Sequence, residues 1–196
     1  MIMNKKAIKI LQGLLFIFII AAFIYIGTRD FSHKINVDNE KFDSEYANVN
    51  KDNVFVYSNA TDIYSIMKNG SAIIFMGFPE NVWSGYYANI INEAAKETGI
   101  KEVLYYNFYE DRQNKNGTYQ SIVLKLKNYV LTNDVGVQNI NAPTLIIVKK
   151  GEILYYDNET AIMIGNLTPE DYWTDYRKGI KLNNFKTMFT NYLSSN

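Results

Sequence analysis

A continuous apolar run at residues 72–78 places the strongest constraint on the fold of this chain. Seven such residues without polar alternation are typical of a strand that is buried on both of its faces. A Pro-Glu-Asn break at 79–81 ends the run, and residues 82–98 then repeat apolar side chains at helical spacing as far as Gly99. A strand buried on both faces needs helices above and below its sheet, so the sequence predicts an α/β fold.

The rest of the chain alternates between short apolar runs and amphipathic segments. Strands are predicted at residues 54–57, 102–108, 144–148 and 153–156, and helices at 63–69, 119–130 and from 168 onward. Residues 149–152 have the composition of a tight hairpin turn, and residues 109–117 are predicted to be a charged loop. The order β-α-β-α-β-α-β-β-α indicates a central mixed sheet with helices on both faces.

The N-terminal region contains a second long apolar run, Ile10 to Gly27, which only Gln12 interrupts. At ~1.5 Å per residue a helix of this length spans roughly 27 Å, which is enough for the hydrocarbon core of a bilayer. Lysines precede the run, so we expect a single-pass signal anchor in the cell membrane, with a cytoplasmic N-terminus and an extracytoplasmic remainder. A cleaved signal peptide is the alternative, although Ala21-Ala22 is a poor cleavage site because large apolar residues follow it. A buried core helix is a third alternative, which the apolar residues on every face count against.

Composition divides the chain into four expected parts. They are a cytoplasmic tip and transmembrane anchor at 1–27, a polar linker at 28–52, an α/β domain at 53–160 and a C-terminal helical extension at 161–196. Within the linker, Phe42, Tyr46 and Val49 lie at helical spacing, so a short helix is an alternative there.

The residue inventory excludes several kinds of chemistry. The chain has no cysteine, which rules out thiol–disulfide exchange, disulfide bonds and cysteine-ligated metals. Its single histidine, His33, lies in the predicted linker and argues against a histidine metal site or general base. Basic and acidic residues number 20 each, so a nucleic-acid partner is not expected. We therefore predict no catalytic residue, no metal and no cofactor.

Residues 72–107 resemble the membrane-anchored bacterial thioredoxin-like proteins, some of which are labelled bacteriocin transport accessory proteins. In that family the strand ends in Gly-Phe-Pro, and after one further residue a Cys-Pro-Trp-Cys-type site follows. Here residues 77–79 keep the Gly-Phe-Pro motif. The four positions that match the active site are Asn81, Val82, Trp83 and Ser84. Both cysteines are lost, so the resemblance implies a degenerate, redox-inactive site.

A second landmark supports the same resemblance at residues 140–153, where Ala142-Pro143 precedes a strand and a Lys-Gly turn. The resemblance implies a thioredoxin-like fold over about residues 53–160 and a cis Ala142–Pro143 bond. Asn81 is predicted to cap the following helix, with Ser84 at its third helical position. A part for these two residues in ligand binding is the alternative.

What survives the loss of both cysteines is a groove that could hold an extended peptide beside the cis-proline. Its predicted lining residues are Phe78, Pro79, Trp83, Ala142 and Pro143. An exposed Trp83 would anchor a partner, whereas packing against its own helix is the alternative. The aromatic residues at 172, 173 and 176 are expected either to dock onto the sheet or to form a second binding surface.

These inferences favour a redox-inactive protein, tethered outside the membrane, that binds peptide or protein partners as an accessory to export or bacteriocin handling. Two alternatives belong to other classes. The chain could be a structural subunit of a membrane complex without a functional groove, or an enzyme that uses no thiol. The missing histidine and the missing catalytic motifs count against the enzyme.

Overall fold

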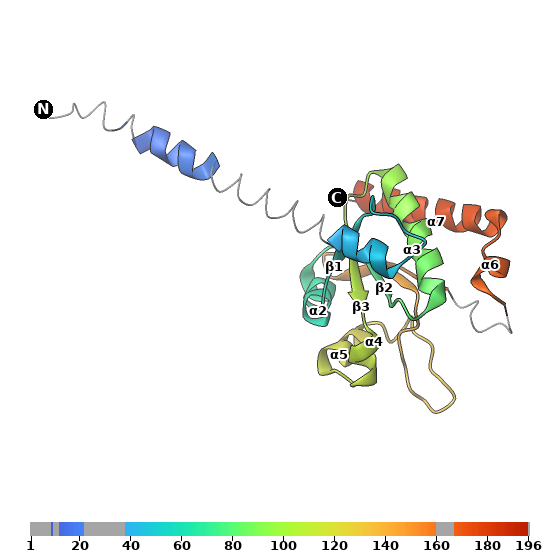
Figure 1. Ribbon diagram of the computed structural model, residues 1–196. Helices are drawn as coiled ribbons and strands as arrows, with labels where there is room; N and C mark the ends of the chain where they lie inside the picture. Colours follow the sequence, from blue (N-terminus) through green and yellow to red (C-terminus); the bar gives the residue numbers. More distant parts are fainter. Residues whose placement is uncertain (1–8, 10–11, 22–37, 160–166, 196) are drawn as a thin grey trace, which may run out of the picture. The chain divides into compact units, whose positions relative to one another are not determined.

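The structure is a computed structural model that describes residues 9, 12–21, 38–159 and 167–195 (Figure 1). The chain divides into two compact units, residues 1–37 and 38–196. In the first unit residues 12–21 are helical. Among the helices that the structure describes, none is both long and apolar enough to cross a membrane. The ends of the predicted anchor, residues 10–11 and 22–27, lie outside the described residues, as does His33.

The second unit alternates strands and helices in the predicted order. Its strands are β1 (Phe55–Tyr57), β2 (Ala72–Gly77), β3 (Val103–Asn107), β4 (Thr144–Lys149) and β5 (Glu152–Asn158). Its labelled helices are α2 (Ala60–Asn69), α3 (Val82–Thr98), α4 (Tyr109–Gln113), α5 (Gly117–Lys125), α6 (Pro169–Tyr172) and α7 (Asp175–Ser194). A further helix covers residues 38–45.

The five strands form one mixed sheet in the order β1-β3-β2-β4-β5. β1, β3 and β2 run parallel to one another, whereas β4 and β5 are antiparallel to their neighbours. This confirms the predicted mixed sheet, and the topology is compatible with a thioredoxin-like fold. The predicted hairpin at 149–152 is also confirmed, with Gly151 at φ 80°. A Cβ at Gly151 would lie 2.1 Å from the Lys68 carbonyl oxygen, so only glycine fits this turn.

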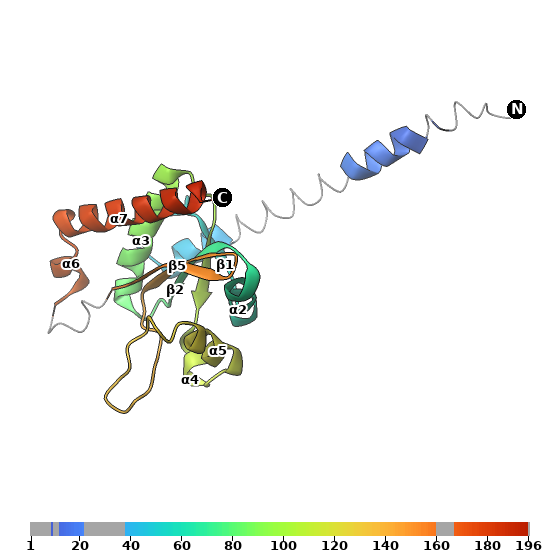
Figure 2. The ribbon, with the colours of Figure 1, turned by 180° about the vertical axis from the view of Figure 1, so that it is seen from behind.

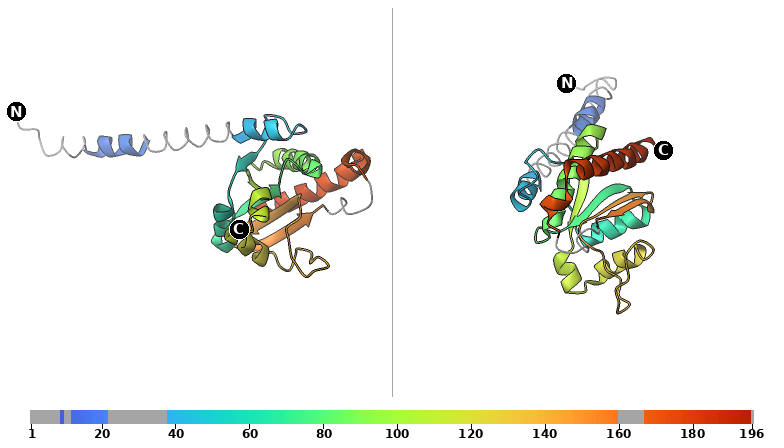
Figure 3. Two further views of the ribbon diagram at one scale, coloured as in Figure 1. Left: turned by 60° about the horizontal axis from the view of Figure 1, so that its bottom comes forward. Right: turned by 90° about the vertical axis from the view of Figure 1, so that its right-hand side faces the viewer.

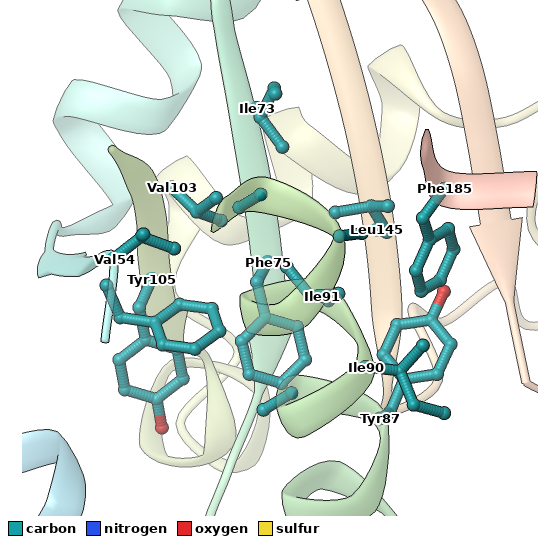
Figure 4. Close-up of a cluster of buried hydrophobic side chains, with 14 of the residues drawn as sticks. Val54, Ile73, Phe75, Tyr87, Ile90, Ile91, Val103, Tyr105, Leu145 and Phe185 are labelled. Carbon is teal, nitrogen blue, oxygen red and sulfur yellow. The ribbon is translucent and has the colours of Figure 1, made fainter. Parts of the chain in front are cut away.

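Strand β2 lies at the centre of the sheet and is buried on both faces. Helices α3 and α7 cover one face of the sheet, and α2 and α5 cover the other (Figures 2 and 3). Ile73 and Phe75 belong to the core cluster with residues of α3 and α7, whereas Ile74 and Met76 belong to the cluster with residues of α2 and α5. Phe75 lies in the middle of the first cluster, between the rings of Tyr105 and Tyr87 (Figure 4). The two clusters explain why the run at 72–78 shows no polar alternation.

The structure corrects the predicted linker, because residues 38–52 belong to the folded unit. Phe42, Tyr46 and Val49 are all buried in the core on the α3 side of the sheet. The Phe42 ring stacks on Phe55 with centroids 4.1 Å apart, and the Tyr46 and Tyr105 hydroxyl groups are 2.9 Å apart. The helical spacing that indicated a short helix was therefore also the signal for a core element.

Two further predictions differ from the structure. Residues 109–113 form the short helix α4 rather than a loop, since Phe108 is buried and Tyr106 donates a hydrogen bond to Asp111 at 2.6 Å. Helix α5 ends at Lys125, and the chain continues in turns that still bury Leu126 and Val130. In both places tertiary packing decides the backbone conformation, which local periodicity does not report.

Replacing Phe42 with alanine tests whether residues 38–52 belong to the core. We expect the free energy of unfolding to fall by about 3–5 kcal/mol, because the ring is fully buried and its removal leaves a cavity. Urea denaturation measures the change. Leu124→Ala, at an exposed position of α5, is the control and should change the free energy by less than about 0.5 kcal/mol. Equal urea midpoints for both variants would mean that residues 38–52 are a linker and not part of the core.

Candidate functional site

The two segments that carry the resemblance meet at one edge of the sheet. Asn81 caps α3, as predicted: its Oδ1 accepts a hydrogen bond from the Ser84 backbone N–H at 3.1 Å. Its Nδ2 donates to the Ala142 carbonyl oxygen at 3.3 Å. The Ala142–Pro143 bond is cis, which confirms the prediction. One amide side chain therefore joins the start of α3 to the cis-proline loop.

Burial separates the four motif positions into two kinds. Val82 is 62% exposed and Asn81 is half-buried, whereas Trp83 is 7% exposed and Ser84 is fully buried. The expectation of an exposed Trp83 is wrong, because its indole packs against the Tyr172 ring with centroids 5.4 Å apart. The alternative was right that Trp83 is packed, but the ring contact comes from Tyr172 of α6 and not from the helix that carries Trp83. The sequence could not show the partner, since Tyr172 comes from a helix 89 positions further along the chain.

The predicted groove residues do not form a single exposed wall. Phe78, Ala142 and Pro143 are buried, and Pro79 is half-buried. Phe78 packs on Phe108 in the cluster on the α5 side, whereas Trp83 belongs to the cluster on the α3 side. Solvent at this edge meets Val82, the exposed Glu80 and parts of Pro79 and Asn81.

The C-terminal extension packs against the motif helix. Tyr86 of α3 donates a hydrogen bond to Glu170, and Tyr172 covers Trp83. Trp173 is buried beside Tyr172, while Tyr176 is 78% exposed. Two of the three C-terminal aromatic residues thus dock onto the domain, and Tyr176 alone remains at the surface.

Beside this contact, the end of β5 and α7 share a network of charges, in which Glu159 is buried and Asp157 and Lys181 are half-buried. Lys181 Nζ lies 2.9 Å from Asp157 Oδ1 and 3.6 Å from Glu159 Oε2. Tyr87 donates to Asp157 at 2.5 Å, and Tyr172 donates to Glu159 at 2.9 Å. Burial, assisted by the Glu159 carboxylate, raises the pKa of the Tyr172 hydroxyl to about 12. Each carboxylate faces a cation and a hydroxyl donor, an arrangement that holds α7 in place.

The motif itself offers no nucleophile with a base. The Ser84 hydroxyl is buried and lies 3.4 Å from Asn81 Oδ1, an amide oxygen that cannot accept its proton in catalysis. Across the described ranges, no group of three histidine, aspartate or glutamate side chains is placed to hold a metal ion.

Sequence reasoning missed Arg112, which the structure places beside the motif loop. Its guanidinium lies over the Phe78 ring at 5.1 Å and over the Phe108 ring at 5.4 Å. The sequence assigned this residue to a charged loop, and an arginine in such a loop gives no indication that it contributes to a binding site. The available signal was its spacing of four from Phe108, which is the spacing of neighbours on a helix.

The fold and the site together define a mixed α/β protein, compatible with a thioredoxin-like fold, that has no thiol at the motif. No protein-family model matches the chain, and no curated protein matches its sequence.

Two variants of Asn81 separate its two hydrogen bonds. Asn81→Ala loses both the helix cap and the bridge to Ala142, and we expect it to lower the free energy of unfolding by about 1–2 kcal/mol. Asn81→Asp keeps a capping oxygen and loses only the bridging donor, so its loss should be smaller. Urea denaturation of both variants measures the order. A larger loss for the aspartate variant would mean that the cap is not the main contribution.

The raised pKa of Tyr172 makes stability depend on alkaline pH. The unfolded side chain releases its proton near pH 10 and the folded one near pH 12, so the stabilisation is present below pH 10 and is lost between about pH 10 and 12. We expect Tyr172→Phe to reduce the fall in unfolding free energy over this interval, as measured by urea titrations at several pH values. Tyr176→Phe, at the surface, is the control for loss of a hydroxyl. Identical slopes for wild type and Tyr172→Phe would contradict the assignment.

Proposed function

We propose that this chain is a redox-inactive thioredoxin-like protein that binds a peptide or protein partner where the motif loop meets the cis-proline loop. The observation that carries the proposal is the Asn81 bridge to Ala142, which keeps both loops together where the resemblance expects a reactive cysteine. Val82 stands exposed beside this bridge, an apolar side chain at the first position of α3. This edge thus offers an exposed apolar side chain and two loops held together, and its motif residues include no activated nucleophile.

The bridge also affects how a partner would bind. The Ala142 carbonyl oxygen already accepts from Asn81, but at 3.3 Å this bond is long, and a carbonyl has a second lone pair. Because Ala142 is buried, a partner backbone N–H would reach this oxygen by displacing the half-buried Asn81 amide. Since Trp83 is buried under Tyr172, apolar contact in the partner complex would fall on Val82 and Pro79.

We place this function outside the cell membrane, with residues 10–27 as a single-pass anchor and the N-terminus in the cytoplasm. The support is the apolar run with its preceding lysines. An accessory role in export or bacteriocin handling follows only from the family resemblance.

A structural subunit of a membrane complex is the second candidate. Its support is the outer surface of α7, where Tyr176 is exposed beside the half-exposed Ile180. Exposed aromatic residues are common anchors in protein interfaces. In this candidate no partner would bind at the motif edge, the surface formed by residues 79–82 beside the cis-proline.

Site-specific photocrosslinking in intact cells distinguishes the two candidates. We expect a probe at Val82 to give a discrete product, because its side chain is exposed at the motif edge. A probe at Tyr176 tests the α7 surface, and one at Lys68, exposed at the end of α2 before β2 begins, is the control. A product from position 176 with none from 82 would favour the structural subunit. Equal products from 82 and 68 would count against a specific motif edge.

A further inference from the structure

A cleft of about 660 Å³ lies next to the motif edge, between the α4–α5 region and the segment that leads into the cis-proline. The α4 side contributes Arg112 and Lys115, and the opposite side contributes Val137, Asn139 and Asn141. Asn141 immediately precedes the Ala142–Pro143 bond. The segment between α5 and β4 projects away from the sheet as a narrow loop (Figures 1 and 2). The cleft is therefore continuous in sequence with the edge that we propose for partner binding.

The lining of this cleft is cationic. Arg112 and Lys115 line it together with carboxamide and apolar side chains, and none of its lining residues is a carboxylate. The acids on the same elements, Glu110, Asp111 and Asp134, are not lining residues, and Asp111 accepts a hydrogen bond from Tyr106. Within the described part of the chain, neither cation has an ion-pair partner. The lining of the cleft thus includes two basic residues without an ion-pair partner in the described part of the chain.

Arg112 is held in place by aromatic rings rather than by an acid. The guanidinium lies over the Phe78 and Phe108 rings, and in the described part of the chain its N–H donors make no side-chain hydrogen bond. A planar guanidinium in this state matches a carboxylate, which can accept two parallel hydrogen bonds from it. Carboxamides on the opposite wall can donate further hydrogen bonds to the same group.

The projecting loop adds apolar contacts beside the charges. Val135 at its tip is 80% exposed, and Val137 and Leu131 are also exposed. The loop is nevertheless ordered by Asn133, whose Oδ1 accepts from the Val137 backbone N–H at 2.8 Å. Exposed aliphatic side chains on a braced loop favour a partner that offers aliphatic residues next to its acid.

We propose that the cleft binds a glutamate or aspartate side chain from an extended acidic segment of a protein partner. This inference rests on the proposed function and specifies its partner. Glu80, exposed in the motif loop, disfavours a second acid at that end of the edge. The acid of the segment therefore turns toward Arg112 and Lys115, while an aliphatic residue lies over Val82.

The test uses a blocked, labelled peptide of alternating valine and glutamate, with the same peptide carrying glutamine as the neutral control. Fluorescence anisotropy measures binding to the full chain in a non-ionic detergent. We expect the acidic peptide to bind at least tenfold more tightly than its neutral form at 50 mM salt, and less so at 300 mM. Equal affinities for both peptides, or no binding of the acidic one, would overturn the proposal.

Variants assign the effect to the cleft. We expect Arg112→Gln and Lys115→Gln each to weaken the acidic peptide about tenfold and to leave the neutral one unchanged. Lys115 is exposed and stacks on no ring that the structure describes, so its variant keeps the test valid if Arg112→Gln perturbs folding. Lys68→Gln is the matched control. If both cleft variants bind the acidic peptide with unchanged affinity, its glutamate side chains bind outside the cleft.

The same variants separate this inference from the proposed function. A Val82 crosslink that persists in Arg112→Gln and Lys115→Gln, without loss of yield, would keep the binding edge and reject the acidic cleft. Loss of the crosslink in those variants alone supports the cleft. Absence of any Val82 crosslink in the wild type, with acidic-peptide binding that depends on Arg112, would reject the motif edge and retain the cleft.

Discussion

Burial of β2 on both faces is the constraint on which the rest of the structure depends. A strand that presents Phe75 to one layer and Met76 to the other can be stable only between two sets of helices. Its pairing with β3 on one side and β4 on the other then fixes where those strands begin and end. The motif loop leaves the C-terminal end of β2, and the cis-proline precedes β4 at the same edge. The site is thus a consequence of how one strand is packed.

A single amide now occupies the point where the resemblance expects a reactive thiol. A cysteine at a helix N-terminus gains reactivity because the helix favours its anion. Asn81 uses the same helix end differently: its oxygen satisfies a backbone donor, and its nitrogen satisfies the Ala142 carbonyl. At this position the amide has a structural part, since it holds the motif loop and the cis-proline loop together. This is why we interpret the edge as a binding surface rather than as the remnant of an unfolded site.

The local pattern of apolar and polar residues was sufficient to predict the strands of the sheet and most of the helices that cover it. The bounds of α3, its Asn81 cap and the tight turn before β5 all follow from residue types that have few conformational alternatives. The pattern failed where distant contacts decide. Phe42 is a core residue because Phe55 stacks on it, and Trp83 is buried because Tyr172 returns from the C-terminal region. Neither partner can be identified from the spacing of neighbouring residues, and the cleft at Arg112 depends on the α5–β4 loop in the same way.

The packing of α6 against α3 has an optical consequence. The chain has two tryptophans, Trp83 and Trp173, and both are buried on either side of Tyr172. All tryptophan fluorescence therefore comes from the contact of Trp83 and Trp173 with Tyr172. These residues are far in sequence from Phe42 and the rings around it. A shift in the wavelength of tryptophan emission therefore reports whether the C-terminal extension is packed on α3, and the measurement needs no added label. The protein carries an intrinsic fluorophore at the junction between its motif helix and its C-terminal segment.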